Sequence, residues 1–225
     1  MDDAGLDNPF HSALRTVHDP VALRSGPVLR YPASHAPFIG VPEPGTRVDD
    51  ALSVLVPPGD TVLWLGLAPD VGPGWSLEAF RPLAQMVCDA PLEVVDGPDV
   101  VRLGEPHRAD VLALTALVYP HYFRERTMDL GRYFGIYLDG RLAAMVGERL
   151  GTHHARELSA ICTHPDCTGR GLARRLTAML ANDLLASGRL PFLHVSHENP
   201  RAFELYRRLG FRHRRDIPFW SLRRA

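Results

Sequence analysis

Residues 168–173, with the sequence TGRGLA, combine residue types that could hold a phosphate group through the main chain. The residues before this segment have the apolar pattern of a strand, and those after it have the pattern of a helix. The first N–H groups of a helix lack partners within it, and the helix dipole adds partial positive charge there. Gly169 and Gly171 would let a ligand approach the backbone, and Arg170, Arg174 and Arg175 add charge. A diphosphate fits such a turn; a tight turn with solvated arginines is the alternative.

The elements that must position this turn can be predicted from hydrophobic periodicity and turn residues. Asp139-Gly140 is a tight-turn signal between two apolar runs, and Asn199 and Gly210 have the positions of a helix cap and a helix exit. The predicted order is a strand at 100–104, a helix beginning near 107, a hairpin at 134–150, a strand at 156–165, a helix from 172 to about 188, a strand at 191–196, a helix at 199–210, and one or two strands at 211–224. Strands that alternate with helices and antiparallel hairpins predict a mixed α/β or α+β sheet.

The first half of the chain has a different composition. Fourteen of the twenty prolines lie in residues 1–98, so we expect short elements joined by many turns there. Residues 51–56 and 61–67 are interpreted as two strands around the turn PPGD. No catalytic constellation is recognised in this half. The sequence therefore predicts an N-terminal α/β region at 1–98 and a catalytic domain at 99–225.

Composition excludes several function classes. The chain of 225 residues has a formal net charge of −1, and no apolar run approaches membrane-spanning length, so we expect neither a nucleic-acid nor a membrane partner. Arginines do concentrate between residues 201 and 224, but no recognition motif accompanies them. The absence of lysine excludes a Walker-type phosphate loop and Schiff-base chemistry. Three cysteines make no disulfide framework, and a cytoplasmic protein is expected. The oligomeric state stays open, a homodimer included.

The second half resembles the GNAT superfamily of acetyl-coenzyme A-dependent N-acetyltransferases over residues 100–222. The small residues of the family's coenzyme loop match Gly169, Gly171 and Ala173, whereas Thr168 replaces the usual Gln or Arg. About thirty residues later, the family's second motif matches Asn199, Ala202, Tyr206 and Gly210-Phe211. The resemblance implies an α+β fold, with a mixed and mostly antiparallel sheet flanked by helices. A smaller, Pro-rich α/β domain, either a degenerate second copy or a lid over the acceptor, would precede it.

The same resemblance implies acetyl-coenzyme A as co-substrate and an amine as acceptor. Main-chain groups of Ile161 and Thr163 would hold the pantetheine arm and the acetyl carbonyl, and the amides of residues 168–173 would hold the diphosphate. The expected binding set is Ile161, Cys162, Thr163, Thr168, Gly169, Arg170, Gly171, Leu172, Ala173, Arg174, Asn199, Ala202 and Tyr206. An acetyl-coenzyme A sensor without catalysis is the alternative function.

Three residues are the catalytic candidates. By the resemblance, Tyr206 is the acid that protonates the leaving thiolate, and a core tyrosine is the alternative reading. Glu157 takes the position of the glutamate base in the histone-acetylating branch of the family. Glu148 lies on the preceding strand and is expected roughly opposite Glu157, where two close carboxylates would raise the pKa of one. A hydrated strand edge is the alternative.

The acceptor amine is expected over residues 119–127, where Tyr119, Tyr122 and Phe123 could line a pocket. Plain core packing is the alternative for these aromatics. Cys162, His164 and Cys167 have the spacing of part of a zinc site, but no second ligand pair follows. No metal is therefore predicted.

Overall fold

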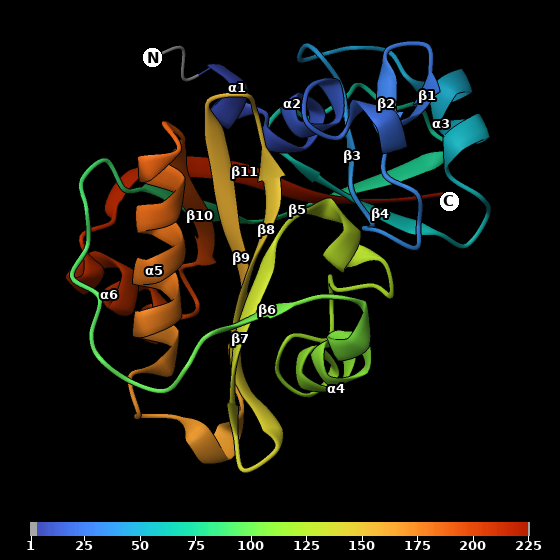
Figure 1. The fold of residues 1–225 in the computed structure, drawn as a ribbon. Coiled ribbons are helices and arrows are strands. Elements are labelled where there is room, and N and C mark those ends of the chain that lie inside the picture. The colour runs from blue at the N-terminus through green and yellow to red at the C-terminus, as the bar shows by residue number, and fades with distance from the viewer. Residues whose placement is uncertain (1–3, 225) are drawn as a thin grey trace.

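A twisted β-sheet runs through the molecule and holds eight strands in the part that the computed structural model describes, residues 4–224 (Figure 1). The strand order is β4-β11-β5-β10-β9-β8-β7-β6. β9 and β10 are parallel, and the other neighbouring pairs are antiparallel, which confirms the predicted mostly antiparallel sheet. The bounds are β4 (Thr61–Leu65), β5 (Trp75–Val87), β6 (Val101–Leu103), β7 (Tyr133–Leu138), β8 (Arg141–Gly151), β9 (Ala155–Thr163), β10 (Leu190–Ser196) and β11 (Arg212–Arg224).

Helices cover both faces of this sheet. α5 (Leu172–Ala186) and α6 (Pro200–Leu209) pack on one face, where Leu176, Leu180 and Leu184 of α5 enter a core with Ala144 and Val146 of β8. α4 (Arg108–Val118) packs with Met145, the residue between those two, and therefore lies on the opposite face. Short 3₁₀ turns connect these elements: η2 (Glu105–His107), η3 (Thr127–Leu130) and η4 (Pro165–Cys167). The elements predicted for residues 100–224 are confirmed, with residues 211–224 forming one long strand.

The N-terminal residues form a small layer beside one end of the sheet. It contains α1 (Ala4–Asp7), α2 (Pro9–Arg15), η1 (Asp19–Val21), α3 (Asp49–Leu55) and a three-stranded sheet of β1 (Leu23–Ser25), β2 (Val28–Arg30) and β3 (Ile39–Gly40). The prediction of a strand at 51–56 is wrong, because this segment is α3. Ala51, Leu52 and Leu55 are buried at helical spacing, while Val54 faces solvent, and Asp49 and Asp50 stabilise the first turn of the helix.

The predicted division at residue 98 does not coincide with the architecture of the sheet. β4 and β5 come from the first half of the chain, yet β5 lies between β10 and β11, and β4 pairs with the outer edge of β11. Figure 1 shows β5 crossing the molecule beside β10 and β11. The first half therefore supplies structural strands of the large sheet as well as the small N-terminal layer.

Candidate functional site

The site lies where β9 and β10 stop pairing. The two parallel strands are in register only from Leu190↔Ala155 to Phe192↔Glu157, and β10 continues along β5 alone as far as Ser196. Past this point the pairing of β9 with β8 shifts register, and Ala160 has a left-handed φ of 49°. Such a bulge takes main-chain groups out of the regular ladder. The diverging strands thus open the centre of the sheet.

A cavity of about 510 Å³ and a groove of about 580 Å³ meet at this opening. The cavity extends toward β5, β11 and the end of α4, and the groove extends along the loop before α5 and the start of α6. The residues that line both spaces are Ile161, Thr163, Asn199, Ala202 and Tyr206. A molecule in the groove could therefore meet a second molecule in the cavity.

The groove has the features of an anion site. Gly169 and Gly171 have φ of 79° and 75°, and no atom lies within 4 Å of where a Cβ would be at either residue. Within residues 4–224, the amides of residues 169–174 have no hydrogen-bond acceptor. The charged side chains of the lining are the cations Arg170, Arg174, Arg201 and Arg208 and the single anion Glu204. Unpaired amides, arginines and a helix N-terminus together suit a phosphate-bearing ligand.

The predicted coenzyme residues lie largely together in this groove. It is lined by Ile161, Thr163, Thr168, Gly169, Arg170, Gly171, Leu172, Ala173, Arg174, Asn199, Ala202 and Tyr206. Cys162 instead faces the cavity. The Thr168 hydroxyl donates to the Pro165 carbonyl (3.0 Å), so this side chain stabilises its own turn. The Asn199 side chain accepts a hydrogen bond from the Ala202 amide (3.1 Å), as expected of the cap of α6.

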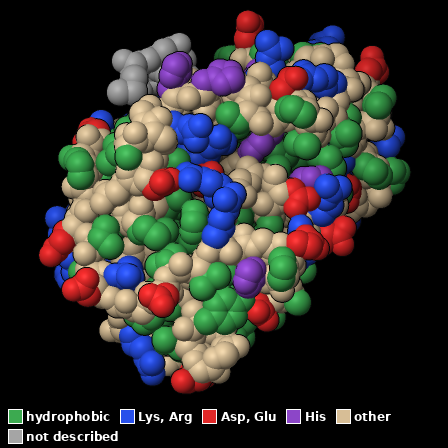
Figure 2. Space-filling view, in the orientation of Figure 1, with side chains coloured by type: hydrophobic (Ala, Val, Ile, Leu, Met, Phe, Trp, Pro, Cys, Tyr) green, Lys and Arg blue, Asp and Glu red, His purple; other side chains and the backbone are tan. Residues whose placement is uncertain are grey.

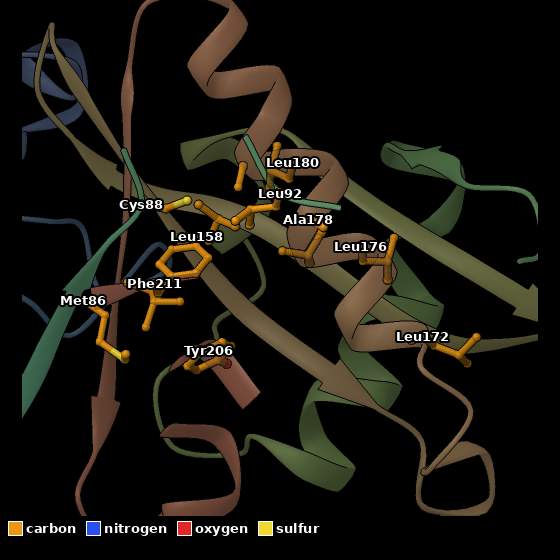
Figure 3. Packing of buried hydrophobic residues seen from close by; sticks show 14 of the residues in the cluster. Met86, Cys88, Leu92, Leu158, Leu172, Leu176, Ala178, Leu180, Tyr206 and Phe211 are labelled. Atoms are coloured by element: carbon orange, nitrogen blue, oxygen red, sulfur yellow. The ribbon is translucent and has the colours of Figure 1, made fainter. Parts of the chain in front are cut away.

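Tyr206 lies at the junction of the two spaces. It belongs to a packed cluster with Leu158 and Phe211, which Figure 3 shows at close range. Its ring centroid is 6.2 Å from that of Phe211. Burial, followed by the nearby Cys162 and Tyr119, raises the pKa of the Tyr206 phenol above its usual value. The hydroxyl is therefore protonated at neutral pH.

Glu157 lies on the cavity wall with its carboxylate fully engaged. Arg149 donates to both of its oxygens (3.0 and 3.1 Å), the Leu150 amide donates to one (3.2 Å), and His194 Nδ1 lies 2.8 Å from the other. Burial acts to raise the pKa of this carboxyl, but Arg149 and His194 outweigh it and hold the pKa at about 2. The expectation of a pKa raised by a neighbouring carboxylate is wrong.

Glu148 does not lie opposite Glu157. A register irregularity in β8 pairs Glu148 with Leu158, so that Glu148 faces the side of the sheet covered by α5. There it binds Arg132, whose guanidinium also lies 2.6 Å from Asp183 of α5. Glu148 lines neither the cavity nor the groove. Glu148 therefore lies opposite the apolar Leu158, and the two glutamates point to opposite faces of the sheet.

Sequence reasoning missed the partners of Glu157. Arg149 is one residue beyond Glu148 and faces the cavity because of the same irregularity. His194 of β10 bridges Glu157 and Gln85: its Nε2 lies 3.0 Å from the Gln85 side-chain nitrogen, which also donates to the Leu6 carbonyl (2.8 Å). A buried polar chain therefore crosses from β8 to β5. Only an alternating polar residue in an otherwise apolar strand, such as His194 in PFLHVS, could have signalled it.

Two of the three aromatic residues predicted to line an acceptor pocket face the cavity. Tyr119 and Tyr122 line it, together with Phe80, Arg81 and Leu83 of β5 and Phe219 of β11, which sequence reasoning did not select. Phe123 does not line it. Its ring packs edge-on against Tyr133, with centroids 5.9 Å apart, within the core under α4. The alternative of core packing holds for Phe123.

No group of three metal-binding side chains comes together within residues 4–224. Cys88, Cys162 and Cys167 are free thiols. Among the described helices, none is both long and apolar enough to span a membrane. Positively and negatively charged side chains are interspersed over the face shown in Figure 2.

Comparisons with known proteins agree with this geometry. The model of the FR47-like protein family matches residues 133–220. A search of curated proteins found no significant match. Among solved structures, an acetyltransferase of the GNAT family from Novosphingobium aromaticivorans is 33% identical, covers 98% of both chains and gives a TM-score of 0.88. A GCN5-related N-acetyltransferase from Kribbella flavida is 16% identical, covers 96% of this chain and 94% of its own, and gives a TM-score of 0.61. The full-length similarity to the first of these shows that the chain belongs to the GNAT family of acetyltransferases.

Proposed function

We propose that the protein is an acetyl-coenzyme A-dependent N-acetyltransferase, in which an amine attacks the acyl thioester directly within a ternary complex. The observation that carries this proposal is the meeting of an anion-binding groove and a second cavity at Tyr206. A transferase with two substrates needs such a junction, because its reacting atoms must be held close together. A sensor that only binds acetyl-coenzyme A would not need the second cavity.

The groove residues would hold the coenzyme. The free amides of residues 169–174 and the guanidinium groups of Arg170 and Arg174 would bind the diphosphate, and main-chain groups beside Ala160, at the bulge of β9, would hold the pantetheine arm. When bound, acetyl-coenzyme A supplies an activated acyl group. The described residues fit it, because the cradle at Gly169 and Gly171 is open and its amides are unpaired.

Tyr206 would donate its phenolic proton to the departing sulfur, because it lies where the groove and the cavity meet. Glu157 fits the role of base poorly, because every acceptor position of its carboxylate is used and its pKa is about 2. We propose instead that Glu157 fixes Arg149 and His194 in the cavity wall, and that the acceptor enters as the neutral amine. After attack, the nitrogen loses one proton, which returns the Tyr206 phenolate to the phenol, so that the amide and the free thiol of the coenzyme are the products and Tyr206 is regenerated.

Direct attack is favoured over an acyl-enzyme route through Cys162. This thiol lines the cavity, but burial raises its pKa to about 12. Almost none of it is thiolate at neutral pH, and the thiolate is the nucleophile. The free thiols of the chain also suit a reducing compartment such as the cytoplasm, where we propose that the protein acts.

Calorimetry with acetyl-coenzyme A and a thiol-release assay over a panel of amines test this proposal together. We expect binding of acetyl-coenzyme A and release of free thiol that depends on an amine. The Gly171→Val variant places a branched side chain in the open cradle and should weaken binding. The absence of binding at millimolar acetyl-coenzyme A would refute the proposal.

A further inference from the structure

We infer that the acceptor is a small primary amine with one amino group and an uncharged aromatic or similarly flat apolar body. The inference rests on the proposed function and names the substrate class of the cavity beside Tyr206. The cavity volume of about 510 Å³ lies within the range of small-molecule sites. Its lining is supplied by both halves of the chain, since β5 forms one wall.

A row of aromatic rings runs along this wall. The Tyr119 and Tyr122 ring centroids are 5.7 Å apart, those of Tyr122 and Phe219 are 6.3 Å apart, and those of Phe219 and Phe80 are 5.2 Å apart. The four residues come from the segment after α4, from β11 and from β5. Neighbouring rings at these separations provide offset or edge-on contacts to a further ring. Phe80 keeps 42% of its surface exposed, so this end of the row has room for a ligand.

The charged groups of the lining are already paired with one another. Arg149 binds Glu157 in the buried wall, and the Arg81 guanidinium lies 3.8 Å from the Glu198 carboxylate, where both side chains are largely exposed. His194 contacts Glu157 and Gln85 through its two ring nitrogens. Among the described residues, the buried part of the lining therefore offers no uncompensated cation for a carboxylate and no uncompensated anion for a second ammonium, and Arg81 and Glu198 lie at its exposed rim.

The remaining titratable groups of the lining stay neutral. Burial raises the pKa values of the phenols of Tyr119, Tyr122 and Tyr206 and of the Cys162 thiol, so all four are protonated near pH 7. An amino acid or a polyamine would bring an unpaired charge into these surroundings at a large desolvation cost. An amine on an uncharged ring would bury its ring against the aromatic row and present its nitrogen at the junction with the groove.

Matched acceptors test this inference in the thiol-release assay with the full chain and acetyl-coenzyme A. 2-Phenylethylamine and phenylalanine share a ring and an amino group, and phenylalanine adds a carboxylate. 1,4-Diaminobutane adds a second ammonium to a chain of similar length. We expect kcat/KM for 2-phenylethylamine to exceed that for either of the others by at least about 100-fold, as expected when a charge is left unpaired on burial.

Two variants test whether the preference for 2-phenylethylamine depends on the aromatic wall of the cavity. Phe80→Ala should lower kcat/KM for 2-phenylethylamine about tenfold while leaving the dissociation constant of acetyl-coenzyme A unchanged, because Phe80 lines the cavity and not the groove. Leu117→Ala is the matched control: Leu117 is an exposed apolar residue of α4 outside both lining sets, and its truncation should leave both quantities unchanged.

The outcomes separate this inference from the proposed function. Faster thiol release with phenylalanine, 1,4-diaminobutane or a lysine-containing peptide than with 2-phenylethylamine would overturn the inference and leave the function standing. Binding of acetyl-coenzyme A without release of its thiol when 2-phenylethylamine is the acceptor would overturn the inference as well. A failure of acetyl-coenzyme A to bind would overturn both.

Discussion

The groove and the cavity that meet at Tyr206 are built in different ways. The groove comes from two continuous stretches, residues 161–174 and 199–208, each of which carries its own turn and helix start. The cavity draws its walls from separate elements between Phe80 and Phe219. The proposed coenzyme site is thus encoded locally, whereas the proposed acceptor site depends on long-range strand pairing, above all on the insertion of β5.

The largest effect is expected where the two regions meet. Tyr206→Phe removes the proposed proton donor, and general acid catalysis contributes about 10²- to 10⁴-fold, so kcat should fall by that factor. The dissociation constant of acetyl-coenzyme A should stay within about threefold, since the ring remains. Tyr137→Phe is the control, because the Tyr137 hydroxyl binds Asp110 at the surface. Equal kcat in wild type and the Tyr206 variant would remove the role of Tyr206.

Replacing the two glutamates on opposite faces of the sheet should lower the free energy of unfolding by different amounts. Glu157→Gln leaves the buried Arg149 without its anion, and breaking such a pair costs about 3–5 kcal/mol. Glu148→Gln should cost less, because Arg132 is more exposed and keeps Asp183. Urea unfolding of both variants measures the difference. A Glu148 variant that is the less stable of the two would contradict this account of the cavity wall.

Acid should destabilise the fold through a buried histidine that lines neither the cavity nor the groove. Buried His18 of the N-terminal layer contacts the Tyr31 hydroxyl (2.7 Å) and the Leu130 carbonyl (2.8 Å), and burial lowers its pKa from 6.5 to about 4. The unfolded chain then binds more protons than the folded one between pH 6.5 and 4, so stability falls as pH falls through this window, by about 3 kcal/mol for this residue. The free energy of unfolding at pH 7 and pH 4.5 measures it. The comparison with His18→Asn isolates this residue, and an equal pH dependence in that variant would exclude it.

A substitution at the glycine turn should weaken the binding of acetyl-coenzyme A in the groove. Gly171→Ala forces a side chain into a left-handed conformation, at a cost of about 1–2 kcal/mol, and points a methyl group into the open cradle. We expect affinity for acetyl-coenzyme A to fall about tenfold in calorimetry. Gly188→Ala, at the other end of α5, has a similar φ of 71° and open space and should cost stability without affinity. Equal loss of affinity in both variants would exclude a specific role for the cradle.

The smallest effect is expected at Cys162. Because its thiol is protonated and the proposed attack is direct, Cys162→Ala should change kcat by less than about threefold. Mass spectrometry of the protein quenched during turnover should show no acetyl group on this residue. An acetylated Cys162 that forms and decays at the rate of turnover would establish the acyl-enzyme route instead.

Sequence reasoning predicted the locally encoded groove better than the cavity, whose walls depend on long-range strand pairing. The turn at Gly169 and Gly171, the hairpin at Asp139-Gly140 and the cap at Asn199 were predictable, because each depends on neighbouring residues. β5 was not, because Pro82 interrupts its pattern, and the structure accommodates Pro82 only at an irregularity where β5 faces Pro218 of β11. The partners of Glu157 were missed for a related reason. A one-residue irregularity in β8, which no composition signal marks, exchanges Glu148 for Arg149 in the cavity wall.

A crystal structure of the protein with acetyl-coenzyme A is the most direct test of the central claim, that the groove holds the coenzyme and delivers its thioester to the cavity at Tyr206. The account predicts diphosphate oxygens within about 3 Å of amides in residues 169–174 and the sulfur within reach of the Tyr206 hydroxyl. A diphosphate bound away from these amides, or a thioester pointing away from the cavity, would contradict it.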